Sequence, residues 1–260
     1  MIWIPIADLA ITFAALLALL WLVVPDAAPW VVLKTGFDRI RRQADLRWFM
    51  LAGLVVLGLD AVESQLDWWL TRWLGLDFTP LIYRWEGDLA RSFQFTAAPW
   101  VIGLFAVFYE IIFSALMFGA PFLYAYRRQD RALKILVGAY MVEYLVVFPF
   151  YLFFPVLETG EGQVFAQRLT SQISPLLDRQ IFGYFESSNN CFPSTHTALA
   201  LIMALVAWDA GERRWGMVNL LSSGMVVFST VYLGIHWVLD VVAGLVVGWG
   251  VYRGTKRWIA

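Results

Sequence analysis

The chain has 260 residues, of which 60% are hydrophobic and 15% are charged, and its formal net charge is −1. This composition lies outside the range of soluble globular domains and is typical of an integral membrane protein. Because basic and acidic residues nearly cancel, no global field attracts nucleic acid, and no nucleic-acid partner is expected. The single cysteine, Cys191, excludes an intrachain disulfide and a cysteine-rich metal site, and we expect a small buried thiol there.

Repeated apolar stretches predict seven membrane-spanning helices. No basic residues precede the first stretch and no clear cleavage site follows it, which favours a retained helix over a signal peptide. The predicted spans lie near residues 3–24, 48–66, 98–126, 133–154, 195–208, 215–234 and 237–252. The expected fold class is therefore an all-α integral membrane protein, with a six-helix core and one extra N-terminal transmembrane helix.

The distribution of positive charge predicts the orientation of these helices. Most of the 19 lysine and arginine residues follow the first, third, fifth and last predicted spans. Since basic residues accumulate in cytoplasmic connections, these four should face the cytoplasm, which places the N-terminus outside and the C-terminus inside. Residues 1–47 would form the first helix and a cytoplasmic connection, and residues 48–260 the main membrane domain.

Two outer connections are long, covering residues 67–97 and 155–194. Residues 68–85 mix apolar and charged side chains, which fits either an amphipathic helix along the membrane surface or a partly ordered loop.

The stretch "CFPSTHT" contains one of the two histidines of the chain. Pro193 suits a chain entering a helix, and Ser194 or Thr195 suits the N-cap. The start of a helix offers unpaired N–H groups and a partial positive charge, which favour a bound phosphate. His196 would lie in this first turn, where an imidazole beside a bound anion can donate a proton to a leaving oxygen.

The second histidine lies in "GIHWVLDVVAG". On a helix, His236 and Asp240 share one face because they are four residues apart. A carboxylate beside an imidazole fixes its tautomer and raises its nucleophilicity. An acid one turn inside an apolar segment is unfavourable unless it is paired, which marks Asp240 as a functional residue. Both helices would begin at the outer face, so His196, His236 and Asp240 should converge near the outer membrane interface.

"PSTH" followed by "STVYLGIHWVLD" resembles the type 2 phosphatidic acid phosphatase superfamily of membrane lipid phosphatases and phosphotransferases. The motif Pro-Ser-Gly-His of that family stands here with Thr195 in place of glycine. Its later motif, Ser-Arg, five residues, His, three residues, Asp, corresponds to Ser229, Thr230, His236 and Asp240. The resemblance covers much of the chain after the first predicted helix.

The resemblance implies specific roles. His236 would be the nucleophile that forms a phosphohistidine, Asp240 would orient it, and His196 would protonate the leaving group. Ser194 would help to hold the phosphate, with Thr195 and Ser229 beside it. The family uses no metal, and we expect no cofactor.

Two departures from the family pattern concern positive charge. Thr230 replaces a phosphate-binding arginine, and the basic first motif is missing where the chain reads "FFPVLETGEG". A dianionic phosphate favours bidentate arginine, so Arg168 and Arg179 in the same outer connection are the replacements we consider.

Because it lacks both basic motifs and keeps the two histidine motifs, the sequence resembles the branch that contains inositol phosphorylceramide synthase and sphingomyelin synthase. Those enzymes transfer a phosphorylated headgroup from one lipid to an alcohol. The phosphodiester of such a substrate carries a single negative charge, which needs fewer cations. The expected partner is therefore a phospholipid or isoprenoid phosphate in the plasma membrane. A polyprenyl-diphosphate or phosphatidate phosphatase is the alternative, and no oligomeric state is indicated.

Three other interpretations remain open at this stage. His196 and His236 could be axial ligands of a b-type haem, or could join Asp240 in a metal site. An ion-coupled transporter is the third, with a path formed by Asp60, Glu63, Glu110 and Glu143. Gly244 and Gly248, four residues apart, predict a close helix–helix contact.

Overall fold

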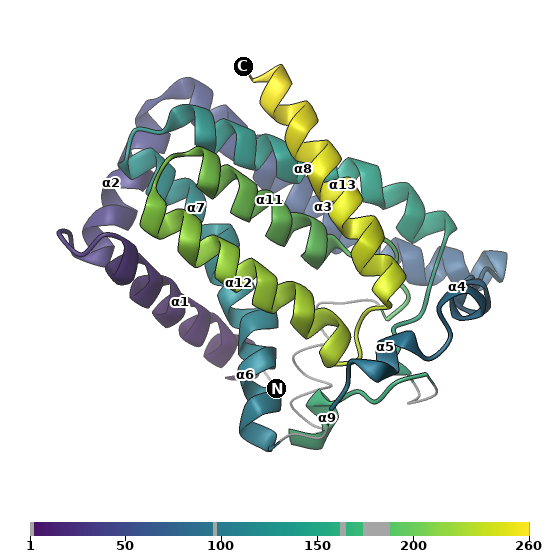
Figure 1. Cartoon of the computed structure of the whole chain (residues 1–260). Coiled ribbons are helices and arrows are strands. Elements are labelled where there is room, and N and C mark those ends of the chain that lie inside the picture. The colour runs from purple at the N-terminus through teal and green to yellow at the C-terminus, as the bar shows by residue number, and fades with distance from the viewer. Residues whose placement is uncertain (1–2, 96–97, 162–164, 174–187, 260) are drawn as a thin grey trace.

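The computed structural model describes residues 3–95, 98–161, 165–173 and 188–259. Within these ranges every regular element is a helix, and the β pairing is one isolated bridge between Val156 and Asn190. The predicted all-α class is therefore confirmed, and Figure 1 shows the long helices packed side by side in a bundle.

Each of the seven predicted spans coincides with a helix. The corresponding elements are α1 (Trp3–Val23), α3 (Ala44–Leu74), the continuous rod of α6 (Pro99–Ala106), η1 (Val107–Ile112) and α7 (Phe113–Tyr126), α8 (Asp130–Phe153), α11 (Thr195–Asp209), α12 (Arg213–Tyr232) and α13 (Val238–Trp258).

Three described helical segments are long and apolar enough to cross a membrane, namely Pro99–Tyr126, Asp130–Phe153 and Val238–Trp258. Ala7–Val23 and Thr195–Asp209 are apolar but shorter. The chain is thus a membrane protein by these helices and by its composition, while the count of seven spans and the extra N-terminal helix stay predictions.

The connection after the first span contains a helix that the sequence analysis did not predict. α2 (Pro29–Arg42) begins with a proline at its first turn and buries Val32, Gly36 and Ile40, which are spaced four residues apart along one face. At Gly36 an added Cβ would lie 2.3 Å from the Phe122 carbonyl oxygen, so α2 packs directly against the α7 backbone.

The first outer connection is also more helical than expected. α3 continues to Leu74 and ends at Gly75, whose φ of 64° provides the left-handed C-cap. α4 (Thr79–Glu86) and α5 (Leu89–Ser92) follow. Residues 68–85 therefore form neither a single surface helix nor a loop, because the glycine divides them between α3 and α4. The second outer connection contains the short helix α9 (Thr170–Ile173).

Ion pairs join the helix ends that carry the basic connections. Arg39 of α2 contacts Asp130 at the start of α8, at 2.7 Å, and Lys134 lies 2.7 Å from Asp45. Two further ion pairs join the remaining helix ends of this set: Arg127 pairs with Glu212, and Lys256 pairs with Asp209. These connections thus lie at one end of the bundle, and their position on the cytoplasmic side stays a prediction.

Candidate active site

The start of α11 is built by a serine cap. Ser194 has an extended backbone (φ −68°, ψ 106°), and its Oγ accepts the Thr197 N–H at 3.3 Å. Of the two predicted caps the structure therefore selects Ser194. The neighbouring Thr195 hydroxyl instead lies 2.5 Å from the Tyr151 hydroxyl.

His236 lies in a tight turn between α12 and α13. The Thr230 carbonyl accepts the N–H groups of both Ile235 and His236, and Gly234 has a φ of 80° that the turn requires. α13 begins only at Val238, so His236 precedes the helix and the expectation that it shares a helical face with Asp240 is wrong. The turn nevertheless brings His236 Nδ1 to 3.5 Å from Asp240 Oδ2.

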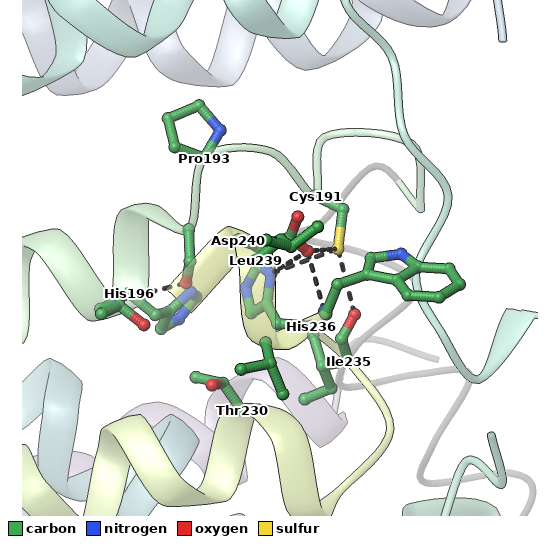
Figure 2. A network of polar contacts seen from close by, with 12 residues as sticks. Cys191, Pro193, His196, Thr230, Ile235, His236, Leu239 and Asp240 are labelled. Carbon is green, nitrogen blue, oxygen red and sulfur yellow. Dashed lines mark hydrogen bonds and ion pairs between the residues drawn. The ribbon is translucent and has the colours of Figure 1, made fainter. Parts of the chain in front are cut away.

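Asp240 is held in place by the backbone of both motifs. Its Oδ2 accepts the Trp237 N–H at 2.9 Å, which closes the first turn of α13, and its carbonyl accepts the Ser194 N–H at 3.2 Å. The start of α11 is thereby bonded to the first turn of α13. The imidazole rings of His196 and His236 lie 6.5 Å apart between centroids, and Figure 2 shows Asp240 beside His236. The three residues predicted to converge thus lie near one another, with His236 and Asp240 buried and His196 partly buried, while their catalytic roles stay predictions.

Two glycines allow α11 and α13 to approach this closely. An added Cβ at Gly244 would lie 2.5 Å from the Ser194 carbonyl oxygen, and one at Gly248 would lie 2.6 Å from the Ala198 carbonyl oxygen. The predicted close contact at these glycines is confirmed.

An aromatic pair that the sequence analysis missed holds His196. The Tyr109 ring stacks on the imidazole at 4.3 Å between centroids, with its hydroxyl 3.3 Å from Nδ1, and the Phe113 ring lies at 4.6 Å. Tyr109 belongs to the π-helical turn η1, and Phe113 begins α7. Such turns are common at functional sites, but nothing in the apolar run of this segment signals one.

Cys191 is buried as expected, but its neighbours were not predicted. Its Sγ lies 2.9 Å from Asp240 Oδ2, 3.2 Å from His236 Nδ1 and 3.2 Å from the Ile235 carbonyl oxygen. Burial, followed by the carboxylates of Asp240 and Glu158, raises the pKa of the Cys191 thiol well above its usual value. The thiol is therefore an uncharged S–H donor at neutral pH. The position of Cys191 directly before the "FPSTH" motif was the signal in the sequence that could have predicted its place in the site.

Glu86 of α4 is a further residue that the sequence analysis missed. Its two carboxylate oxygens accept the N–H groups of Val238 and Leu239, at 2.9 and 2.8 Å. These are orphan donors of the first turn of α13, so Glu86 occupies the anion position at the start of this helix. Burial raises the pKa of the Glu86 carboxyl, and the Asp240 charge adds to this rise.

The remaining predicted substrate contacts have other partners in this structure. Ser229 donates its hydroxyl to the Met225 carbonyl at 2.6 Å, and Thr230 donates its own to the Val227 carbonyl at 2.7 Å. Arg168 forms an ion pair with the buried Glu158, and Arg179 lies outside the described residues. The substrate-binding roles of Ser229, Arg168 and Arg179 stay predictions.

The segment that contains Arg168 is anchored to the histidine turn. The Gly160 N–H donates to the Gly234 carbonyl at 2.7 Å, and the Leu169 N–H donates to the Leu233 carbonyl at 3.1 Å. The second outer connection thus supports the turn that carries His236.

An apolar cavity of about 240 Å³ lies between α3, α7, α8 and α11. Its lining includes Leu54, Phe118 and Met141, together with Thr195 at the start of α11 and the carboxyl-bearing Glu143 of α8. Thr195, which directly precedes His196 in the sequence, links the cavity to the start of α11. Glu143, one of the acids considered for an ion path, therefore lines this cavity. The side chains of Asp60 and Glu63 are not among those that the structure describes.

Comparison with known proteins identifies the family of the chain. An uncharacterized protein from Methanocaldococcus jannaschii is 28% identical over 81 residues, which cover 31% of this chain and 33% of that protein. The matched part is thus about a third of the length of this relative. No solved structure matches the chain. The family model described as PAP2 superfamily matches residues 70–253, a range that contains both histidine turns and the helices that bring them together. The chain therefore belongs to the PAP2 superfamily.

Proposed function

We propose that the chain is a membrane lipid phosphatase or phosphotransferase that works through a phosphohistidine on His236. Members of the PAP2 superfamily are generally phosphatases, which supports a lipid phosphatase-like activity. The observation that carries the proposal is the proximity of the three polar side chains of His196, His236 and Asp240. His236 Nδ1 lies 3.5 Å from Asp240 Oδ2, and the His196 ring lies 6.5 Å from the His236 ring.

In the first half of the reaction, Asp240 accepts a hydrogen bond from the N–H at His236 Nδ1, which fixes the tautomer with the lone pair on Nε2 at the opposite edge of the ring. Nε2 attacks the phosphorus of the lipid, and a P–N bond forms. The P–O bond to the leaving group breaks, and its oxygen takes a proton from His196.

In the second half, His196 accepts a proton from the incoming hydroxyl group, whose oxygen attacks the phosphorus. The P–N bond breaks and His236 is regenerated. Water as the acceptor gives a phosphatase, and a lipid or polyol hydroxyl gives a transferase. Tyr109 stacks on His196 and holds Nδ1 of that ring, so it orients the acid–base group.

Local charge favours headgroup transfer as in inositol phosphorylceramide synthase. Thr230 stands at the family position of an arginine, and the Arg168 guanidinium is partnered by the Glu158 carboxylate. Stabilising a dianionic monoester with so little positive charge is unfavourable, whereas a phosphodiester, with one negative charge, tolerates it better. The proposed substrates are therefore diesters, with diphosphates and phosphatidate as the alternative.

We place the hydrocarbon chain of the lipid in the cavity between α3, α7, α8 and α11. Its lining is mostly apolar and it adjoins Thr195, one residue before His196. A chain held there extends from the reacting phosphate toward the middle of the bundle, as a phospholipid or isoprenoid substrate requires. The site would then open to the outer leaflet of the plasma membrane, with the basic connections on the cytoplasmic side.

The decisive experiment is a lipid panel in which phosphate release and new-lipid formation are measured together on the purified protein. New phospholipid without phosphate identifies a transferase, and phosphate alone identifies a phosphatase. Substrate labelled in the phosphorus should leave label on wild-type protein after denaturation in base, where phosphohistidine survives, and none on His236→Ala. Turnover by His236→Ala at the wild-type rate would refute the mechanism.

A further inference from the structure

Three side chains with metal-binding atoms meet at the base of the site. Cys191 comes from the segment before α11, His236 from the turn after α12, and Asp240 from the first turn of α13. The atoms Sγ, Nδ1 and one carboxylate oxygen all lie within 4.8 Å of one another, and all three residues are buried. Figure 2 shows this group joined by dashed lines, with the Cys191 sulfur beside the Asp240 carboxylate.

The spacing of these atoms is close to that of a tetrahedral zinc site. Zinc bonds of about 2.0–2.3 Å to sulfur, nitrogen and oxygen place the ligand atoms roughly 3.3–3.6 Å apart. The observed separations are 2.9 Å from Sγ to Oδ2, 3.2 Å from Sγ to Nδ1 and 3.5 Å from Nδ1 to Oδ2. Displacements of a few tenths of an ångström in side chains would therefore accommodate the ion.

A second observation points to a ligand at the same place. Asp240 is fully buried, and its Oδ1 has no hydrogen-bond partner among the described residues. A buried carboxylate oxygen without a partner is unfavourable by about 1–3 kcal/mol or more. A cation bound by both oxygens of this carboxylate would contact Oδ2, which lies near Sγ and Nδ1, and would also satisfy Oδ1.

We propose that Cys191, His236 and Asp240 form a binding site for a thiophilic divalent cation such as Zn²⁺, and that the bound ion switches the enzyme off. The ion takes the thiolate, His236 Nδ1 and the Asp240 carboxylate as ligands, with the fourth position open to water. The thiol proton is released to solvent on binding.

The inhibitory role follows from the tautomer of His236. This role rests on the proposed function, whereas the metal site itself does not depend on that function. A neutral imidazole that coordinates a metal through Nδ1 carries its proton on Nε2. Nε2 then has no lone pair with which to attack phosphorus. Metal binding and nucleophilic attack are therefore mutually exclusive at His236.

The choice of ligands sets the metal selectivity. Thiolate and imidazole suit Zn²⁺ and related transition metals, whereas Mg²⁺ and Ca²⁺ favour sets of oxygen ligands. Millimolar Mg²⁺ or Ca²⁺ should therefore neither fill the site nor protect it from Zn²⁺.

Cobalt gives a test that does not depend on turnover. Because Cys191 is the single cysteine, any cobalt–thiolate charge-transfer band must come from it. The full chain in lipid nanodiscs, without thiol reductants, is titrated with Co²⁺ while circular dichroism monitors folding. We expect a near-ultraviolet band that saturates at about one equivalent and is displaced by Zn²⁺ but not by Mg²⁺. Folded wild-type protein without this band would overturn the proposal.

Variants then identify the other ligands. Cys191→Ser should abolish the band, and Asp240→Asn and His236→Asn should each weaken cobalt binding at least about 10-fold, since loss of even an outer partner of a metal ligand has that effect. Asp209→Asn, at the opposite end of α11, is the control and should keep the wild-type band. A band unchanged in both ligand variants would indicate an isolated thiolate and would refute the site.

Activity assays test the inhibitory role separately. Zn²⁺ should inhibit wild-type lipid turnover, and Cys191→Ser should need at least about 10-fold more Zn²⁺ for half-inhibition, relative to its own metal-free rate. Equal sensitivity of both proteins would overturn the inhibitory role. A cobalt band without turnover of any lipid would remove the proposed function and keep the metal site, whereas turnover without a band would do the reverse.

Discussion

The Tyr109 ring lies against the His196 imidazole with a centroid separation of 4.3 Å and its hydroxyl 3.3 Å from Nδ1. Tyr109→Phe keeps this stack and removes only the hydroxyl. Because one hydrogen bond contributes about 0.5–1.5 kcal/mol, we expect kcat to fall about 3- to 10-fold with little change in KM. The pH profile of kcat should shift as well. A profile that does not move would mean that Tyr109 only packs against the ring.

The His236–Asp240 pair predicts a graded loss of activity. His236→Ala should abolish turnover, and Asp240→Asn should lower kcat by a factor on the order of 10³–10⁴, because the amide no longer fixes the imidazole tautomer. The measurement is steady-state turnover of the lipid identified by the panel. Thermal unfolding of each variant serves as the control for folding, and wild-type activity in Asp240→Asn would refute the orienting role.

Glu86 predicts a combined effect on stability and activity. Glu86→Ala removes the acceptor for two N–H groups of the first turn of α13, so we expect a loss of about 1–2 kcal/mol in the free energy of unfolding and a lower kcat. Thermal and denaturant unfolding measure the first effect, and turnover measures the second. Glu86→Gln keeps one acceptor oxygen and should recover part of the stability and part of the turnover. If Glu86 only filled space, the acceptor oxygen would not matter and no such recovery would be required.

The pH dependence of stability gives a separate test of Glu86. Burial raises the pKa of this carboxyl above its ordinary value of 4.5, so the folded state binds its proton more tightly than the unfolded state does. The stabilisation from this effect is fully present below 4.5 and is lost as the pH rises through the higher folded-state pKa. In Glu86→Ala the free energy of unfolding should lack this decline. An identical pH dependence of stability in the wild type and in Glu86→Ala would contradict this role of Glu86.

Two glycines of α13 form a matched pair for testing the contact between the motifs. A Cβ at Gly244 would lie 2.5 Å from the Ser194 carbonyl oxygen, whereas nothing lies within 4 Å of one at Gly250. Gly244→Ala should lower stability by about 1–3 kcal/mol and reduce kcat, because it separates His196 from His236. Gly250→Ala should raise stability by about 0.5–1 kcal/mol and leave kcat unchanged. Similar behaviour of the two variants would show that the close contact is not required.

The apolar cavity predicts selectivity for chain length. Met141→Trp reduces its volume, so KM should rise several-fold for long-chain lipids and change little for short-chain analogues. Leu145→Trp, on the exposed face of the same helix, is the control and should behave as wild type. Equal effects of Met141→Trp on long and short chains would place the lipid elsewhere.

Sequence reasoning was most reliable where long apolar runs determine local structure. The runs at residues 98–126 and 133–154 predicted helices because such segments must satisfy their backbone groups internally in a membrane. α2 was missed because its three buried positions are separated by charged residues, and these residues suggested a polar connection. The end of α3 was misplaced because the left-handed conformation of Gly75 is a property of a single residue within an otherwise continuous pattern.

The residues of the site that belong to the two motifs were predicted, and those that reach the site only through tertiary contacts were missed. His196, His236 and Asp240 could be named because their spacing and position at helix starts have a chemical meaning. Glu86 and Tyr109 lie far from both motifs in the sequence, and only packing brings them to the site. Cys191 was correctly expected to be buried, but its contact with both members of the His–Asp pair depends on the turn that ends α12.

The hydrogen bonds from Gly160 and Leu169 to the carbonyls of Gly234 and Leu233 make the position of His236 depend on a segment far from both histidine motifs. A change that breaks these two bonds would therefore move His236 without touching His196, Asp240 or Cys191.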